Sequence, residues 1–424
     1  MPRTLALAVL DAVLAKRRPF DESFDKHPRT ATLSTRDRAF AYTLIAATLR
    51  RLGQIDAAID ACLQTPLTPR ARGAREVLRL CAAQLLFLGT PAHAAVDTSV
   101  GLAAADPRFA RYKNLVNAVL HKLARDGAGI VAGQDAALLN TPDWLWRSWT
   151  DAYGKATARA IAEAHLDQPP IDLAVKADAA GWAARLSAQL TPTGALRLQP
   201  GAAIASLPGY DEGAWWVQDE AAQLPARLLG DVRGQRVGDI GAAPGGKTAQ
   251  LAARGAHVVA VDRSRPRLRL LTANLARLKL AAEVVEADAR VWRPMEPLDA
   301  ALLDAPCSAT GTIRRHPDIL RIRRPAEVAS AAALQIELLT ATLDMVRSGG
   351  TVVFATCSLQ PEEGPAIVRQ ILAARPDVKR WPISPADIGG EANLVANLLT
   401  VDADLRTLPS HGMDGFYAAR LVKT

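Results

Sequence analysis

The 424-residue sequence has few of the residues that form metal sites and disulfide frameworks. Its four cysteines, Cys62, Cys81, Cys307 and Cys357, show no paired spacing, which favours a reducing compartment over a disulfide-rich secreted fold. The seven histidines are scattered, so we predict no metal site. No apolar run approaches the roughly 18 residues that a membrane span needs. We expect a cytoplasmic protein that has no membrane partner, and we expect a monomer.

Length and charge indicate more than one domain. The chain is longer than one hydrophobic core usually organises, so we expect two or three domains. The net charge is +8, and residues 1–140 hold most of the excess, with 19 Lys and Arg against 12 Asp and Glu. A basic front part favours an anionic partner. Solvated helix faces would give the same excess, so charge alone leaves both interpretations open.

The first 125 residues predict a helical domain. Apolar residues recur at helical spacing, for example Leu5 and Val9, and later Leu115 and Val119. Pro and Gly interrupt the pattern often enough to give about six helices. Several arginines of these helices could form a surface that contacts phosphates: Arg36, Arg38, Arg50, Arg51, Arg70, Arg72, Arg75 and Arg79.

The middle of the chain predicts a linker followed by a small mixed domain. The stretch from Asp126 to Pro142 is rich in Gly and Ala, as flexible linkers are. Residues 155–210 combine short helical stretches with strand-like runs such as 171–175. We expect a small α+β domain there.

From residue 236 onward, short apolar runs alternate with helical stretches. This pattern predicts a parallel sheet with helices on both faces, as in a Rossmann-like α/β domain. The expected strands are 236–241, 257–262, 283–287, 299–304 and 350–356. The expected helices are 247–253, 264–279 and 327–347. The sequence therefore predicts a multidomain protein, with domains over residues 1–130, 131–230 and 231–424.

Several chemically active residues follow the expected strands. The carboxyl ends of parallel strands lie at one edge of a sheet, where α/β proteins bind their ligands. We therefore expect the following side chains to lie close together: Asp262, Asp288, Asp304, Cys307 and Cys357.

The glycine-rich stretch after the strand at 236–241 has two interpretations. Gly241-x-x-x-x-Gly246-Lys247-Thr248 satisfies the phosphate-binding pattern of nucleoside triphosphatases. However, the next strand ends in Asp262, about 20 residues past the glycines, where dinucleotide-type folds have the acid that binds a ribose hydroxyl. An adenosyl cofactor therefore fits better, although these residues alone do not exclude the triphosphatase.

The two later cysteines lie in polar turns, Asp304-Ala-Pro-Cys307-Ser and Thr356-Cys357-Ser. Carbon 5 of cytosine is too poor a nucleophile to take a methyl group unless a thiolate first adds to C6. Asp304 could stabilise that adduct at the N3/N4 edge if burial raises its pKa. Lys247 could lower a thiol pKa or help to polarise the base. The chemistry does not choose between the cysteines, and an isolated cysteine is more often a core residue.

Longer motifs surround these residues. They are Gly-Ala-Ala-Pro-Gly-Gly-Lys-Thr (241–248), Val-Asp-Arg-Ser-x-x-Arg-Leu-x-x-Leu (261–271), Asp-Ala-Pro-Cys-Ser-Ala-Thr-Gly-Thr-Ile-Arg-Arg-His-Pro-Asp (304–318), Thr-Cys-Ser-Leu-x-Pro-Glu-Glu (356–363) and His-Gly-Met-Asp-Gly-Phe-Tyr (411–417). Together they resemble the Sun/Fmu family of RNA cytosine-C5 methyltransferases, and the two cysteine motifs have no role in a triphosphatase.

The front of the chain has a resemblance of its own. It lies in Arg3-x-x-Ala6-x-x-Val9-Leu10, Asp37-Arg38 and Asn114-x-x-Asn117-Ala-Val-Leu120-x-x-Leu123. Over residues 1–125 the chain is similar to the NusB-type RNA-binding fold. With both parts, the chain resembles the bacterial members of the family that act on small-subunit ribosomal RNA.

The resemblance implies S-adenosylmethionine as the cofactor and a role for each matching residue. Asp262 would hold the ribose, Asp288 would lie on the adenine side, and Asp304 would lie between cofactor and target base. Cys357 would be the nucleophile and Cys307 would aid product release, with Lys247 beside them. The implied cofactor-binding set is Gly241, Ala242, Ala243, Pro244, Gly245, Gly246, Lys247, Asp262, Arg267, Asp288 and Asp304.

The expected partner is RNA. Five arginines between the cysteine motifs would steer phosphates toward the site: Arg314, Arg315, Arg321, Arg323 and Arg324. The target cytosine must leave its stack, so we expect a single-stranded or bulged nucleotide. Small-subunit ribosomal RNA, free or in a partly assembled particle, is the expected substrate. Transfer RNA is one alternative, and a non-catalytic RNA-binding or assembly factor is another.

Overall fold

The computed structural model describes residues 1–107, 109–390 and 395–424. The chain forms two compact units. The first contains Met1–Asp167 and Ile313–Arg323, and the second contains Gln168–Thr312 and Arg324–Thr424. The domain boundaries near residues 130 and 230 stay a prediction.

The first unit is helical, which confirms the fold predicted for the front of the chain. Apolar residues at helical spacing bury one face of each helix in a common core, which includes Leu5, Leu44, Ile55 and Leu120. The helices are α1 (Pro2–Lys16), α2 (Phe20–Asp25), α3 (Thr35–Arg50), α4 (Leu52–Cys62), α5 (Arg72–Leu86), α6 (Ala92–Ala105), α7 (Lys113–Ala132), α8 (Ala136–Asn140), α9 (Asp143–Tyr153) and α10 (Lys155–Ala164). Short 3-10 helices precede α3, α5 and α7: η1 (Pro28–Thr32), η2 (Pro69–Ala71) and η3 (Ala110–Tyr112).

The stretch predicted to be a flexible linker is largely helical, so that prediction was wrong. α7 continues through Ala132, and α8 follows soon after it. Gly127 is buried in α7, and a Cβ at this position would lie 2.7 Å from Leu86 Cδ2 in α5. This glycine therefore lets two helices pack closely and does not signal flexibility.

A short piece of chain from the second half of the sequence completes the first unit. Residues 313–323 contain α15 (Ile319–Ile322), and Ile322 joins the core of the helices. The backbone N–H of Phe20 donates a hydrogen bond to Asp318 Oδ2 at 3.0 Å. His316 Nδ1 lies 3.0 Å from Asp21 Oδ2. The helical unit is therefore assembled from two distant parts of the chain.

The second unit is built on a large mixed sheet with the strand order β10-β12-β9-β8-β5-β6-β7, in which β11 also pairs with β12. The strands are β5 (Arg236–Ile240), β6 (His257–Asp262), β7 (Glu283–Glu286), β8 (Leu298–Asp304), β9 (Val346–Thr356), β10 (Val378–Arg380), β11 (Leu405–Arg406) and β12 (Tyr417–Lys423). Strands β5 to β9 pair in parallel, and β12 is antiparallel to β9. The predicted Rossmann-like sheet is confirmed, with β9 beginning earlier than expected.

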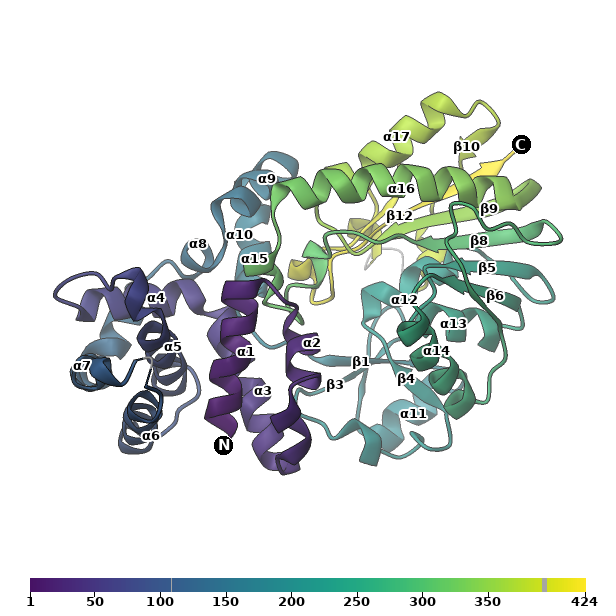
Figure 1. Ribbon diagram of the computed structural model, residues 1–424. Helices are drawn as coiled ribbons and strands as arrows, with labels where there is room; N and C mark the ends of the chain where they lie inside the picture. Colours follow the sequence, from purple (N-terminus) through teal and green to yellow (C-terminus); the bar gives the residue numbers. More distant parts are fainter. Residues whose placement is uncertain (108, 391–394) are drawn as a thin grey trace. The chain divides into compact units, whose positions relative to one another are not determined.

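Helices cover both faces of this sheet. The helices are α12 (Glu220–Arg227), α13 (Gly246–Ala253), α14 (Arg265–Leu278), α16 (Pro325–Met345), α17 (Pro365–Ala374) and α18 (Pro385–Ile388). On one face, α16 and α17 contribute Leu339 and Ile371 to the core. On the other, α12 and α13 contribute Leu224 and Leu251. Among the described residues only α16 is long and apolar enough to cross a membrane, and its packing along the strands accounts for this composition (Figure 1).

The chain changes direction across the sheet between β5 and β8. From β5 it moves outward to β6 and β7, and then it crosses back to β8 and β9. In open α/β sheets, such a switch point leaves a crevice outside the carboxyl ends of the two strands, where ligands bind. Gly241 follows β5 and Asp304 ends β8, so two predicted site residues flank this point.

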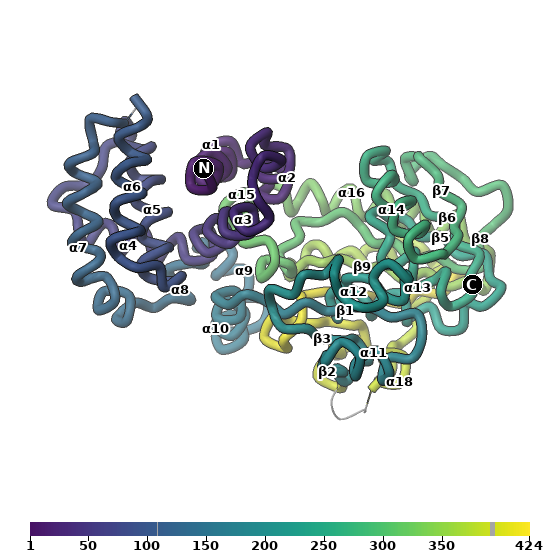
Figure 2. Tube along the Cα trace, turned by 90° about the horizontal axis from the view of Figure 1, so that it is seen from below, coloured from purple at the N-terminus to yellow at the C-terminus, as the bar shows by residue number. Residues whose placement is uncertain are grey.

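A small antiparallel sheet precedes the large one, as the mixed pattern predicted. Its strand order is β2-β3-β1-β4, and its core contains Trp182 and Trp215. Figure 2 shows β1 beside α12. The elements are β1 (Ile171–Val175), α11 (Ala179–Leu186), β2 (Gln189–Leu190), β3 (Leu196–Leu198) and β4 (Trp215–Val217).

Candidate active site

The loop after β5 passes so close to its neighbours that it has no room for larger residues. Gly241 has a φ of +79°, and a Cβ there would lie 2.5 Å from the carbonyl oxygen of Asp304. Gly245 has a φ of +105°, and a Cβ there would lie 2.9 Å from the side chain of Leu271. Only glycine adopts such conformations readily. The loop therefore brings bare backbone to the switch point, where α13 begins with free N–H groups.

Asp262, the last residue of β6, supports the glycine-rich loop. Its Oδ2 accepts a hydrogen bond from the N–H of Ala243 at 3.2 Å, and its Oδ1 accepts one from the N–H of Ser264 at 2.8 Å. Arg267 Nη1 lies 3.6 Å from Asp262 Oδ2, and the same guanidinium donates to the carbonyl of Ala243. The structure thus brings together three of the predicted cofactor-binding residues.

Asp288 follows β7, as predicted, but its carboxylate is held by a neighbour. The guanidinium of Arg290 donates to both carboxylate oxygens, with Nη2 lying 2.6 Å from Oδ2. This hydrogen bonding lowers the pKa of Asp288 to about 2. The role of Asp288 on the adenine side stays a prediction.

Asp239 is a residue of this site that sequence reasoning missed. It is fully buried in β5, and Thr248 Oγ1 donates a 2.5 Å hydrogen bond to its Oδ2. Its Oδ1 has no partner among the described residues. Burial raises the pKa of Asp239 to about 6. Asp239 Oδ1 is thus a free acceptor close to the glycine-rich loop, and Asp262 and Asp288 add carboxylates at or just past the ends of β6 and β7. These groups fit S-adenosylmethionine, whose amino and hydroxyl groups are hydrogen-bond donors.

Lys247, in the first turn of α13, forms an ion pair with Asp304 at the switch point. Its Nζ lies 2.7 Å from Asp304 Oδ2, and the two side chains are 10% and 30% exposed. The same Nζ lies 5.2 Å from the centre of the Phe416 ring. Burial lowers the pKa of Lys247, but the charge and hydrogen bond of Asp304, together with the nearby Asp239 and Cys357, outweigh burial and raise this pKa above its ordinary value. Lys247 is therefore an ammonium ion at neutral pH.

Cys307 and Cys357 come from different loops, and their Sγ atoms lie 3.4 Å apart. Both thiols are free and half-buried. The hydrogen bond with Cys357 raises the pKa of the Cys307 thiol well above its ordinary value, and burial and the nearby Glu363 carboxylate add to the effect. Cys307 therefore holds its proton more tightly than an ordinary thiol, and a hydrogen bond can join the two sulfur atoms.

Gly311 and Gly415 join the two cysteine loops to the loop before β12 through backbone hydrogen bonds. The N–H of Gly311 donates to the carbonyl of Cys357 at 2.9 Å, and the N–H of Gly415 donates to the carbonyl of Gly311 at 2.8 Å. A Cβ on Gly311 would lie only 1.9 Å from the carbonyl oxygen of Gly415. The motifs at 304–318, 356–363 and 411–417 therefore meet at one place, which explains why the last of them accompanies the cysteines.

The five arginines predicted to contact RNA have different surroundings. Arg315 and Arg324 are exposed, and Arg323 is half-buried, so their role stays a prediction. Arg314 is only 4% exposed. Burial lowers the pKa of Arg321 to about 10, and its guanidinium donates to a backbone carbonyl of α8 at 3.0 Å. Arg314 is enclosed by the helical unit and Arg321 is half-buried against α8, so their contact with RNA stays a prediction.

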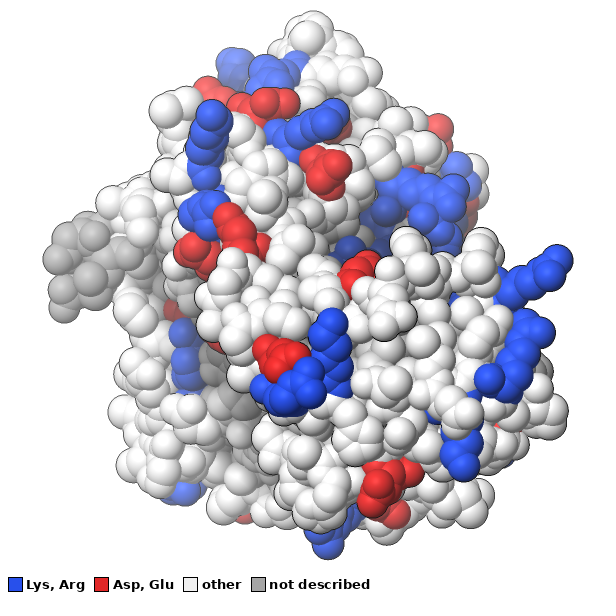
Figure 3. Space-filling view, turned by 90° about the vertical axis from the view of Figure 1, so that its left-hand side faces the viewer, with Lys and Arg blue, Asp and Glu red and all other residues white. Residues whose placement is uncertain are grey.

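The arginine surface predicted on the helices is largely neutralised. Arg75 and Arg79 pair with Asp56 at 3.2 and 2.6 Å. Arg50 is buried and donates to two backbone carbonyls. On the face that Figure 3 presents, Lys and Arg are interspersed with Asp and Glu and form no continuous basic surface.

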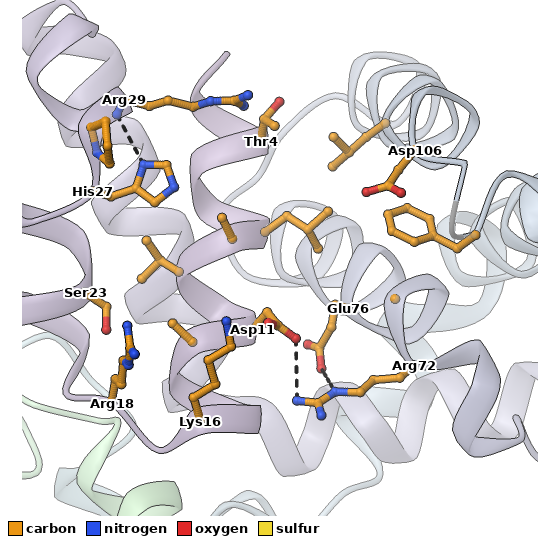
Figure 4. A pocket seen from close by; sticks show the side chains of 18 of the residues that line it. Thr4, Asp11, Lys16, Arg18, Ser23, His27, Arg29, Arg72, Glu76 and Asp106 are labelled. Carbon is orange, nitrogen blue, oxygen red and sulfur yellow. Dashed lines mark hydrogen bonds and ion pairs between the residues drawn. The ribbon is translucent and has the colours of Figure 1, made fainter.

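A groove of about 1490 Å³ opens in the helical unit between α1, the η1 region and the start of α5 (Figure 4). Its lining includes apolar residues such as Leu7 and Phe109. Lys26 and Arg72 also line it, but acids neutralise them. Four exposed cations of the lining have no ion pair among the described residues: Lys16, Arg18, Arg29 and Arg70. Free positive charge is therefore concentrated at this groove, which the sequence pattern did not reveal.

The chain matches two protein families. Residues 226–422 match the family described as 16S rRNA methyltransferase RsmB/F, and residues 1–125 match the NusB family. Ribosomal RNA small subunit methyltransferase B of Serratia proteamaculans is 36% identical over 412 residues, which cover 92% of each chain. The protein of the same name from Vibrio cholerae is 36% identical over 407 residues, covering 92% of this chain and 90% of the relative. The chain belongs to the RsmB/F family of methyltransferases.

Solved structures support the same fold. The crystal structure titled PH0851 has a TM-score of 0.74 and 22% identity, and the match covers 100% of this chain and 99% of that chain. A methyltransferase homolog from Pyrococcus horikoshii has a TM-score of 0.56 and 25% identity, covering 72% of this chain and 98% of that chain.

Membership of the RsmB/F family confirms several predictions from the sequence. The enzyme is a methyltransferase, its cofactor is S-adenosylmethionine, and the resemblance to Sun/Fmu and NusB proteins is real. The triphosphatase interpretation of the glycine-rich stretch is excluded. In the structure, Lys247 pairs with Asp304 and Thr248 bonds to Asp239.

Proposed function

We propose that this protein transfers a methyl group from S-adenosylmethionine to C5 of a cytosine in small-subunit ribosomal RNA. The observation that carries the proposal is the 3.4 Å contact between Cys307 and Cys357, in loops that follow neighbouring strands of a methyltransferase sheet. Two thiols in contact suit a reaction that needs covalent activation of a pyrimidine. The protein would act in the cytoplasm as a monomer, on free RNA or on an assembling particle.

The cofactor would lie along the glycine-rich loop. We assign the methionine part to residues 241–247, the ribose to Asp262, and the adenine side to Asp288. The unused oxygen of Asp239 would accept a hydrogen bond from the amino group. When bound, S-adenosylmethionine supplies a methyl group on a positively charged sulfur, and C5 of the base takes up this methyl group.

Cys357 would be the nucleophile. Its thiolate adds to C6, the new S–C6 bond forms, and the electron pair of the C5–C6 double bond becomes available at C5. After methylation a base removes the proton from C5, the C5–C6 double bond forms again, and the sulfur leaves with the S–C6 electron pair. The products are 5-methylcytosine, S-adenosylhomocysteine and a proton.

Cys307 would assist product release. Because its thiol stays protonated, it can donate a hydrogen bond to the Cys357 sulfur and stabilise the thiolate as it leaves. The same hydrogen bond would favour the thiolate before attack. The proposal thus gives Cys357 and Cys307 different roles, which chemical reasoning from the sequence alone could not assign.

Asp304 and Lys247 would stabilise the modified base. The Asp304 side chain is partly exposed and can bond to the N3/N4 edge of cytosine while Lys247 holds its Oδ2. The ammonium of Lys247 also lies close enough to Cys357 for their charges to attract each other. Negative charge that develops at the site is therefore partly balanced.

The groove of the helical unit would bind the RNA backbone. Phosphate contacts depend on cations that are not already neutralised. Lys16, Arg18, Arg29 and Arg70 meet this condition, whereas the pairs formed by Arg75 and Arg79 do not. With no exposed aromatic residue among those that line the groove, we expect backbone contacts and not base stacking.

The test is to incubate unmodified small-subunit RNA with a methyl-labelled cofactor and to analyse the nucleosides by mass spectrometry. We expect labelled 5-methylcytosine. Cys307→Ala should accumulate a covalent RNA–protein adduct, and Cys357→Ala should form none. Label in transfer RNA alone would show that transfer RNA, and not small-subunit ribosomal RNA, is the substrate. If no variant gives label or adduct, the proposed methylation is wrong, and the protein is a non-catalytic RNA-binding or assembly factor.

A further inference from the structure

One fully buried carboxylate connects the two cysteine loops. Glu363 lies in the 3-10 helix η6 (Pro361–Glu363) and has no exposed surface. Its Oε1 accepts a hydrogen bond from the N–H of Ser308 at 2.7 Å. Its Oε2 accepts hydrogen bonds from the hydroxyls of Ser308 and Ser358, the latter at 2.6 Å. Because each serine directly follows one of the cysteines, Glu363 binds the chain next to both thiols.

The surroundings of Glu363 form a closed polar network. The two serine hydroxyls lie 3.1 Å apart, and Ser358 Oγ also accepts from the N–H of Gln360 at 3.0 Å. Thr310 Oγ1 accepts from the N–H of Leu359 at 3.0 Å and so joins the two loops again. A buried carboxylate is costly unless donors surround it. Four donors converge on this one, the fourth being the side-chain amide of Gln335 at 3.5 Å, which is the arrangement that an ionised side chain requires.

We propose that Glu363 is a positioning residue for the cysteine pair, an inference that rests on the proposed function. Through Ser308 and Ser358 it fixes the separation of the two sulfur atoms. Its negative charge raises the pKa of the Cys307 thiol and so disfavours a thiolate there, and the thiolate then forms on Cys357. The sequence motif that follows Cys357 therefore carries part of the chemistry that the cysteines perform.

Charge and shape can be separated by substitution. Glu363→Gln keeps the size and one acceptor oxygen but removes the charge. Ser358→Ala keeps the charge but removes one of the hydrogen bonds that hold the loops. A residue that only stabilised the fold would change the melting temperature in both variants, and it would leave the relative reactivity of the two thiols unchanged. Glu362, the exposed neighbour in the same motif, provides a matched control as Glu362→Gln.

The experiment measures how fast iodoacetamide alkylates each cysteine in the full-length protein, without RNA or cofactor, using peptide mass spectrometry from pH 6 to 9. In the wild type and in Glu362→Gln, we expect Cys357 to react before Cys307. In Glu363→Gln, we expect the ratio of the two rates to fall by about tenfold, which corresponds to one pKa unit. A folded Glu363→Gln protein with the wild-type ratio would overturn the electrostatic part of the proposal.

A second measurement tests the positioning part and remains available if Glu363→Gln does not fold. In Ser358→Ala, we expect methylation to slow by about 10- to 100-fold, the usual cost of a small misplacement of reacting groups, while the alkylation ratio stays near that of the wild type. Wild-type methylation in this variant would overturn the positioning role. If no variant, including the wild type, methylates RNA but the alkylation ratio still depends on Glu363, the proposed function fails and the effect of Glu363 on the thiols stands.

Discussion

Lys247 Nζ and Asp304 Oδ2 lie 2.7 Å apart and join the first turn of α13 to the last residue of β8. The lysine is nearly buried, whereas the aspartate keeps part of its surface in contact with solvent. Loss of Asp304 should therefore destabilise the charged Lys247 side chain more than loss of Lys247 destabilises Asp304. An ammonium that loses its partner in a buried position has no solvent to replace it, but a partly exposed carboxylate does.

Asp304→Asn should therefore lower the free energy of unfolding more than Lys247→Met does. We expect a loss of up to about 3–5 kcal/mol for Asp304→Asn, because it leaves a buried charge without its counter-ion. Asp344→Asn, which breaks an exposed pair with Arg375, should cost less than about 1 kcal/mol. Urea unfolding of the three variants measures these values. Equal losses for Asp304→Asn and Lys247→Met would show that the burial of Lys247 does not govern the pair.

Ala309, two residues after Cys307, has a φ of +60°, in the left-handed region that favours glycine. Ala309→Gly should remove the steric cost of the Cβ and raise the free energy of unfolding by about 0.5–1 kcal/mol, after the greater entropy of glycine in the unfolded chain is subtracted. Thermal unfolding with Ala305→Gly as a control checks this, since Ala305 lies outside the left-handed region. A lower melting temperature for Ala309→Gly would contradict it.

Asp239 should make stability depend on pH. Burial raises its pKa from 3.8 to about 6, opposed in part by Thr248 and Lys247 and reinforced by Asp304 and Asp262. The folded protein therefore binds more protons than the unfolded chain between pH 4 and 6, so stability falls as pH rises through this window. Relative to Asp239→Asn, the wild type should lose up to about 3 kcal/mol between pH 4 and 7. Urea unfolding of both proteins over this range tests the prediction, and parallel pH profiles would refute it.

The four free cations of the groove should control RNA affinity. Replacing Arg18, Arg29 and Arg70 together with Ala should weaken binding of small-subunit RNA and lower the slope of log K against log salt concentration by about two, at roughly 0.7 per phosphate contact on single strands. Arg36→Ala is the control, because Arg36 is exposed on α3 and lies outside the groove. Filter binding at several salt concentrations gives both quantities. An unchanged slope in the triple variant would exclude the groove as the phosphate-binding surface.

Local patterns predicted the catalytic half of the molecule well. The alternation of apolar runs and helical stretches predicted the strands from β5 to β9, and Cys307 and Cys357, which follow β8 and β9, lie in contact as parallel topology predicts. The interactions that cross between loops were not accessible in this way. Glu363 bonds to Ser308, which is 55 residues away, and Asp239 bonds to Thr248 across the glycine-rich loop, and no period or spacing marks such pairs in the sequence.

The helical half was predicted less accurately because charge and composition are ambiguous there. Arg314 and Arg321 have the composition of a phosphate-binding segment, yet this segment packs into the helical unit, which buries Arg314 and half-buries Arg321. The glycines of α7 have the composition of a linker, yet Gly127 serves close packing. In both cases composition alone could not predict these surroundings, because the role of each residue depends on the segment that packs against it in the folded protein.

The origin of Ile322 has a consequence for biosynthesis. Since residues 313–323 supply part of the helical core, the nascent N-terminal region cannot complete that core while the ribosome is still translating the large sheet. We expect this region to stay sensitive to protease on stalled ribosomes until Arg323 has left the exit tunnel. The docking of α15, and not the emergence of α1 to α10, then sets the moment at which the helical unit becomes native.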